Sequence, residues 1–236
     1  MNVKKICGIL IVILFALIVL VFSACGEKDD AVSDREIEAQ TEAMQEEEEE
    51  EVVVEIIGFE NGSTGLSIGD KGPAGGIIFY INPNAEEDGW EYMEMAPLVT
   101  MWEGKAHGGR GLAVGEPAQN KEIGAGLDNT LAIYATYGDN EPYQDFDDYA
   151  AKLCLELIIQ VNGDIFEDWF LPSKHEMGAL INNLYFRGLI DLSDGRYWTS
   201  TEDSTNFSWA QVIGTRMGLT EVNKFTPAFV IAVRRF

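Results

Sequence analysis

An uncharged apolar run near the start of the chain indicates that the first residues are not part of a globular fold. Two lysines precede the run at residues 6–22, and Ser23 and Ala24 follow it. A basic flank, an apolar core and small residues at the cleavage point are typical of a secretory signal peptide. The alternative is an uncleaved membrane helix, but 17 residues lie at the short limit for a span. We therefore expect residues 1–24 to be an export signal that is cleaved from the mature chain.

Cys25 follows these small residues directly. The arrangement resembles the bacterial lipobox, whose cysteine thiol takes a diacylglycerol before cleavage, although Phe22 stands where leucine is usual. Acyl chains contribute about 0.8 kcal/mol per buried methylene, so two or three of them hold a protein firmly on a membrane. We expect Cys25 to be the lipidation site. The protein would then be lipid-anchored in the cell envelope and extracytoplasmic, on the periplasmic face or the cell surface.

An acidic segment separates Cys25 from the rest of the chain. Residues 26–55 contain 14 acidic residues, including the run at 46–51, against only Lys28 and Arg35. High like charge with few apolar residues cannot offset the entropy lost on ordering. We expect residues 25–55 to be a disordered tether, in preference to a metal-binding strip.

The formal net charge of −24 argues against nucleic acid and anionic lipid surfaces as partners, because both require basic patches.

The third cysteine, Cys154, remains alone once Cys7 and Cys25 are assigned to the signal and the lipid. It lies in an amphipathic helical pattern, which favours a small buried residue over a reactive thiol. Residues 56–236 are long enough to bury one core, and we expect them to form a single domain.

The apolar pattern of this domain predicts an α+β fold with antiparallel strands and two main helices. Ser173 and Glu176 form the Ser-x-x-Glu capping box that marks a helix N-terminus. Asp128 or Asn129 is the expected cap of a shorter helix, and residues 103–119 form a Gly-rich stretch without regular structure. The early and final strands can pair and so bring the ends of the domain together. The expected strands are 76–81, 90–95, 196–201, 207–214 and 228–236, and the expected helices are 128–137, 146–161 and 173–186.

Several of these segments resemble, in order, the C-terminal domain of the Legionella collagen-like adhesin, a domain of unknown function. The most specific are Trp-Phe-Leu-Pro-Ser-Lys at residues 169–174 and Tyr-Trp-Thr-Ser-Thr-Glu at residues 197–202. The resemblance covers about residues 68–236 and implies a C-type-lectin-like fold, which formylglycine-generating enzymes share. It also implies a domain that displays a binding surface. This chain departs from the family in lacking a collagen repeat and in being strongly acidic.

Motifs for catalysis or cofactors are incomplete. His175-Glu176 begins like a zinc-protease helix, but Ala179 stands where the second histidine is required. Oxidase chemistry of the formylglycine type needs a cysteine pair, and only Cys154 is present in the domain. Acidic loops around residues 139–148 and 202–206 are candidates for calcium, but solvated loops are favoured. We therefore expect no enzyme activity, no cofactor and no metal site.

The C-terminal strands carry aromatic rings beside amide groups, a combination that binds sugars or protein surfaces. The alternative is that the two tryptophans belong to the core. We expect a non-catalytic, adhesin-like domain that recognises a glycan or a protein. The other interpretations are a structural or scaffolding envelope lipoprotein and an enzyme of unrecognised chemistry. The candidate ligand-binding residues are Trp198, Asn206, Trp209, Gln211 and Asn223.

Overall fold

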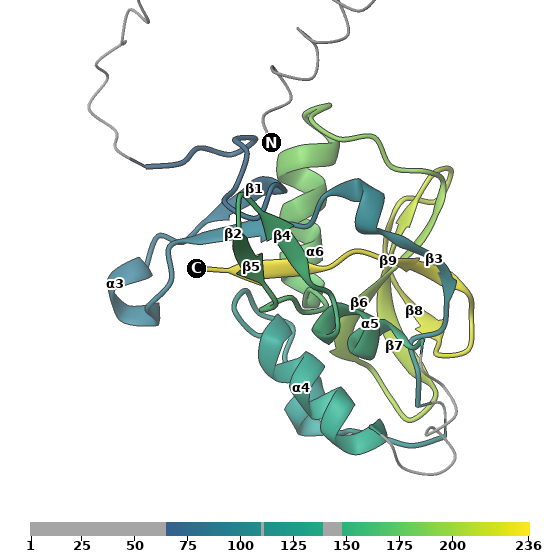
Figure 1. The fold of residues 1–236 in the computed structure, drawn as a ribbon. Coiled ribbons are helices and arrows are strands. Elements are labelled where there is room, and N and C mark those ends of the chain that lie inside the picture. The colour runs from purple at the N-terminus through teal and green to yellow at the C-terminus, as the bar shows by residue number, and fades with distance from the viewer. Residues whose placement is uncertain (1–64, 110, 139–147) are drawn as a thin grey trace, which may run out of the picture. The chain divides into compact units, whose positions relative to one another are not determined.

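A computed structural model describes residues 65–109, 111–138 and 148–236 (Figure 1). The expected signal peptide, Cys25, the acidic tether and the domain boundary at residue 56 all lie outside these residues. The described part is α+β with mostly antiparallel strands, as the sequence predicts. None of its helices combines the length and apolar character needed to cross a membrane.

One three-stranded sheet joins the two ends of the domain. Its order is β1-β2-β10, with both pairings antiparallel. Its strands are β1 (Ile77–Ile81), β2 (Tyr92–Met95) and β10 (Val233–Arg235). Met95 pairs with Ile77 on one side and with Val233 on the other, so β2 lies between β1 and β10. The final strand therefore pairs with an early strand, as expected, but that strand is β2 and not β1.

A five-stranded sheet has the order β3-β9-β6-β7-β8. Its pairings are antiparallel except the single parallel contact of Tyr197 with Phe229 between β6 and β9. Two strands of this sheet, β3 and β8, were not predicted from the sequence. The members are β3 (Trp102–Lys105), β6 (Gly195–Glu202), β7 (Phe207–Ile213), β8 (Gly218–Asn223) and β9 (Ala228–Val230).

Helix α6 (Lys174–Leu180) begins where the capping box predicts. The Ser173 hydroxyl oxygen accepts a hydrogen bond from the Glu176 backbone N–H at 3.2 Å. The Glu176 carboxylate accepts one from the Ser173 N–H at 2.7 Å, which completes the box. A π-helical turn, η3 (Ile181–Tyr185), extends α6 almost to the predicted end.

The other helices differ more from their predictions. Helix α4 (Gly126–Tyr137) begins after Ala125, so the prediction that Asp128 or Asn129 caps it is wrong. The predicted helix at 146–161 is correct only over α5 (Ala150–Leu155). Beyond it the chain forms a hairpin of β4 (Ile159–Val161) and β5 (Asp164–Phe166). Positive φ angles at Asn162 and Gly163 make the hairpin turn, which a continuing helix could not accommodate.

Two expected loops contain short elements. Residues 82–89 include α3 (Ala85–Asp88), which ends at Gly89 in the left-handed conformation. The stretch at 103–119 contains most of β3 and the 3₁₀ turn η2 (Glu116–Ala118). A further 3₁₀ turn, η1 (Leu98–Thr100), joins β2 to β3.

The core lies between the two sheets and α6. Phe79, Met93 and Leu184 belong to a cluster around α6, and Trp169 and Trp198 belong to a second cluster beneath the five-stranded sheet. Cys154 is wholly buried in this second cluster, and burial raises the pKa of its thiol. Its expected role as a small core residue is therefore confirmed.

Candidate functional site

The five candidate ligand residues do not form one surface. Trp198 is fully buried, and its indole N–H donates to the Lys105 carbonyl at 2.9 Å. Gln211 is also buried, and its amide donates to the Val212 carbonyl. The prediction that these two residues contact ligand is therefore wrong, because both side chains are turned into the molecule.

Trp209 is partly exposed but already has a partner. The Lys174 Nζ lies 2.9 Å from the centroid of its ring, a cation–π contact between α6 and β7. Asn206 is exposed in the turn before β7. Asn223, at the end of β8, lines a hollow on the surface.

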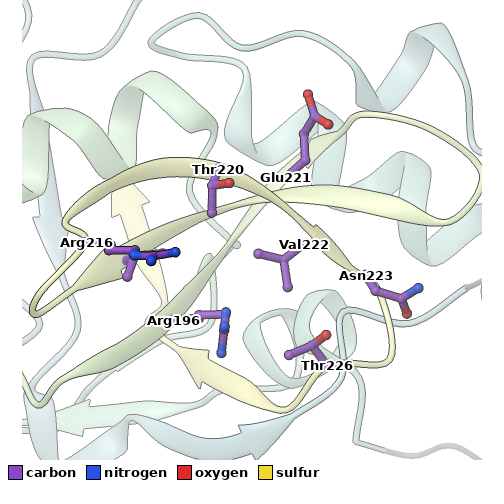
Figure 2. Close-up of a pocket in the computed structure, with 8 residues that line it drawn as sticks. Arg196, Arg216, Thr220, Glu221, Val222, Asn223 and Thr226 are labelled. Carbon is purple, nitrogen blue, oxygen red and sulfur yellow. The ribbon is translucent and has the colours of Figure 1, made fainter.

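The hollow that contains Asn223 has a volume of about 420 Å³ and lies over one face of β6, β7 and β8 (Figure 2). The register explains its composition, because directly paired residues of antiparallel strands share a face. Arg196 pairs with Val212, and the next pairs along β7 and β8 place Thr220 and Val222 on that same face. The lining residues are Arg196, Val212, Arg216, Thr220, Glu221, Val222, Asn223 and Thr226.

Two guanidinium groups dominate the charge of this hollow. Among the described residues, neither Arg196 nor Arg216 forms an ion pair, and both are exposed. Figure 2 shows the carboxylate of Glu221 directed away from both arginines. The register agrees, because Glu221 pairs with Trp209 on the opposite face. The arrangement therefore offers two free cations to a ligand.

Polar and apolar groups complete the lining. Thr220, Thr226 and Asn223 contribute hydroxyl and amide groups, and Val212 and Val222 contribute aliphatic surface. A hollow of a few hundred cubic ångströms with a few directed polar groups has the dimensions of a small-ligand site. A guanidinium group presents paired N–H donors that match a carboxylate.

A buried polar network lies next to the Asn223 end of the hollow. The Lys224 ammonium donates to the Glu202 carboxylate at 2.5 Å and to the Tyr137 hydroxyl at 3.1 Å. The same carboxylate accepts the N–H groups of Val114 and Gly115. Burial raises the pKa of Glu202, but these donors outweigh burial and the net shift is downward. Burial lowers the pKa of Lys224.

His107 lies in the same region and is buried against the edge of Trp198. Its Nδ1 is 3.4 Å from the Ser208 hydroxyl, and its Nε2 has no hydrogen-bond partner among the described residues. Burial and the neighbouring Lys224 charge lower its pKa to about 4, so the ring is neutral at pH 7. Neither His107 nor Ser208 lines any of the four hollows described for this domain.

The metal motifs considered in the sequence have other roles. Glu176 caps α6, and its side chain also accepts the N–H groups of Gly124 and Gly126. Glu202 pairs with Lys224, and Asp148 pairs with Lys105 at 2.9 Å. Most of the acidic loop at 139–148 lies outside the described residues. In the parts of the chain that are described, no group of three or more His, Cys, Asp or Glu side chains is placed to hold a metal ion.

Sequence reasoning missed the arginines because it sought rings and amides. The alternation of Thr220 and Val222 was the available signal for a half-buried strand, with Arg216 just before it. Because β8 was not predicted, its residues could not be placed beside Arg196. No family model and no curated protein sequence matches the chain.

Proposed function

We propose that the chain is a lipid-anchored, non-catalytic binding module of the cell envelope that recognises an acidic glycan. The proposed site is the hollow lined by Arg196 and Arg216, called here the arginine hollow. The observation that carries the proposal is that both guanidinium groups lack an ionic partner among the described residues while hydroxyl and amide groups surround them.

The chemistry of the arginine hollow fits a sugar acid. Guanidinium groups bind carboxylate through paired hydrogen bonds. Threonine hydroxyls and the Asn223 amide suit sugar hydroxyls, and Val212 and Val222 offer apolar surface to the C–H faces of a ring. The chain as a whole has a formal net charge of −24, which repels an extended polyanion. The proposed ligand therefore presents one acidic group to the hollow.

The proposed absence of catalysis is supported by the positions of the acid–base groups. His107, Ser208, Glu202 and Lys224 are buried and bonded to one another or to the backbone. The resemblance of residues 169–174 and 197–202 to the collagen-like adhesin family supports a C-type-lectin-like fold as part of the proposal. The pairing of β1 and β2 with β10 brings the ends of the domain together, which is compatible with that fold.

The proposal is tested by calorimetry with two disaccharides. One contains glucuronic acid, and the other is its neutral counterpart with glucose in the same position. We expect binding of the acidic sugar alone. Arg196→Ala with Arg216→Ala should weaken it at least about tenfold, since a hydrogen bond to a charged group contributes about 1.5–3 kcal/mol.

Lys121→Ala with Arg187→Ala is the matched control, because it removes two exposed cations elsewhere on the domain. Equal loss of affinity in both double variants would mean that net charge, and not the arginine hollow, governs binding. Equal binding of the neutral sugar would also overturn the proposal.

A further inference from the structure

A second hollow, with the opposite charge, lies beside Trp90 and does not involve the arginine hollow. It has a volume of about 510 Å³ and lies between α3 and the end of β10. Its floor is aromatic and aliphatic, formed by Trp90, Tyr92, Phe236 and Ala85. Glu86, Gly89 and Glu91 complete the lining, and no lysine or arginine contributes to it.

The aromatic floor is held in place by contacts within the domain. The Trp90 ring packs on Tyr80 with centroids 6.1 Å apart, and Tyr92 packs on Phe236 at 5.7 Å. The Tyr92 hydroxyl donates to the Glu91 carboxylate at 2.7 Å, so this carboxylate is positioned at the edge of the floor. The surface is therefore organised before any partner binds.

Five acidic residues lie in or beside this hollow. Glu86 and Glu91 line the hollow, and Glu87 and Asp88 belong to the same short helix as Glu86. Asp88 and Asp128 also line a smaller hollow of about 200 Å³ that shares Trp90. None of these five acids forms an ion pair with a described residue.

Trp90 already has a cation beside it. The Arg235 guanidinium carbon lies 6.0 Å from the Trp90 ring, and Arg235 Nη1 donates to the Gly124 carbonyl. The Arg234 guanidinium carbon lies 4.6 Å from the Phe236 ring, and this arginine pairs with Glu94 and Asp168. Neither arginine forms an ion pair with the five acids in and beside the hollow. The electronegative ring faces and these carboxylates favour positive charge at this place.

We propose that the Trp90 hollow is a docking site for a lysine-bearing segment of a partner protein. The argument for this occupant is charge complementarity combined with shape. The methylene stem of a lysine covers apolar ring surface while its ammonium group remains at the polar edge. Here the stem would lie on the rings of Trp90, Tyr92 and Phe236, and the ammonium would reach Glu86 and Glu91. A neutral or acidic segment would leave these carboxylates unpaired.

The test uses the full-length chain in detergent and a fluorescent peptide with the sequence Gly-Lys-Gly-Lys-Gly. Its partner probe carries acetyl-lysine at both positions, which keeps the stem and removes the charge. Fluorescence anisotropy should show binding of the lysine peptide, and binding of the acetylated peptide should be at least about tenfold weaker.

Glu86→Gln with Glu91→Gln should weaken the lysine peptide about tenfold, because it removes both lining carboxylates and keeps the aromatic floor. Asp164→Asn with Asp191→Asn is the matched control, since it changes net charge equally at exposed positions outside the hollow. This control should bind within twofold of the unmodified chain, and thermal unfolding should confirm that all variants fold.

Three results would overturn the proposal. One is no measurable binding of the lysine peptide, and another is equal loss in the control variant, which would reveal nonspecific attraction. The third is tight binding of a neutral oligosaccharide that Glu86→Gln with Glu91→Gln leaves unchanged, which would assign the hollow to sugar. Arg196→Ala with Arg216→Ala should leave lysine-peptide binding unchanged, so the two sites can fail independently.

Discussion

Trp198 and Trp209 stand on neighbouring strands, and the pleat of the sheet turns them to opposite faces. Trp198 pairs with Ala210 and enters the core, where its N–H reaches the Lys105 carbonyl. Trp209 pairs with Glu221 on the other face, where Lys174 covers its ring. The alternation of side chains along a strand thus gives one buried tryptophan and one partly exposed tryptophan.

We expect Trp198→Ala to destabilise the domain by about 3–5 kcal/mol, because it leaves a large cavity and an unpaired Lys105 carbonyl. Trp209→Ala should cost about 1 kcal/mol, as is usual for a partly exposed side chain. Urea unfolding followed by circular dichroism measures both values. Equal losses would show that Trp209 is as important to the core as Trp198.

At the scale of elements, α6 is tied to the start of α4 by one carboxylate. Glu176 completes the capping box and also accepts the N–H groups of Gly124 and Gly126, at 2.8 and 3.2 Å. Burial raises its pKa to about 7, against the lowering effect of these backbone donors. The native state therefore holds a proton on this carboxyl group more tightly than the unfolded state does.

Stability should consequently fall as the pH rises from about 4.5 to about 7. In this pH window the Glu176 carboxyl group of the native state binds a proton that the unfolded state has released. The stability that this proton contributes is therefore complete below the unfolded pKa and is lost as the pH rises past the folded pKa. Glu176→Gln removes the titration and should flatten this part of the profile. The free energy of unfolding of both proteins at several pH values tests this, and identical slopes would contradict it.

At the scale of the whole domain, buried ion pairs connect segments that are distant in sequence. Lys224, the residue after β8, pairs with Glu202 of β6. The pair also bonds to Leu112, Val114 and Gly115, and to Tyr137 at the end of α4. Arg234 connects β10 to Glu94 in β2 and to Asp168. The first set of contacts ties the five-stranded sheet to residues 112–115 and to α4, and the second ties the three-stranded sheet to the segment before α6.

We expect Lys224→Met to destabilise the domain by about 3–5 kcal/mol, because it leaves the Glu202 charge buried without its partner. Lys224→Met with Glu202→Gln should recover part of this loss, since the second change removes the uncompensated charge. Urea unfolding of the single and double variants gives the coupling energy. A double variant no more stable than Lys224→Met would contradict a charge-based cause.

The sequence by itself determined the elements whose signals act within a few residues. The Ser173–Glu176 box placed the start of α6, and the β-rich runs placed β1, β2, β6, β7 and β9. It also identified Cys154 as a core residue. The helix predicted at 146–161 failed beyond Leu155 because tertiary contacts favoured a hairpin where local periodicity favoured a helix.

The tertiary structure alone decided the sites. Arg196 meets Val222 and Thr220 only through the pairing of three strands, and Trp198 finds its acceptor 93 residues away. Glu202 and Lys224 neutralise one another across the sheet, which no spacing in the sequence reveals. Local patterns report which face of a strand is apolar, whereas the partners of a polar side chain depend on the register between distant segments.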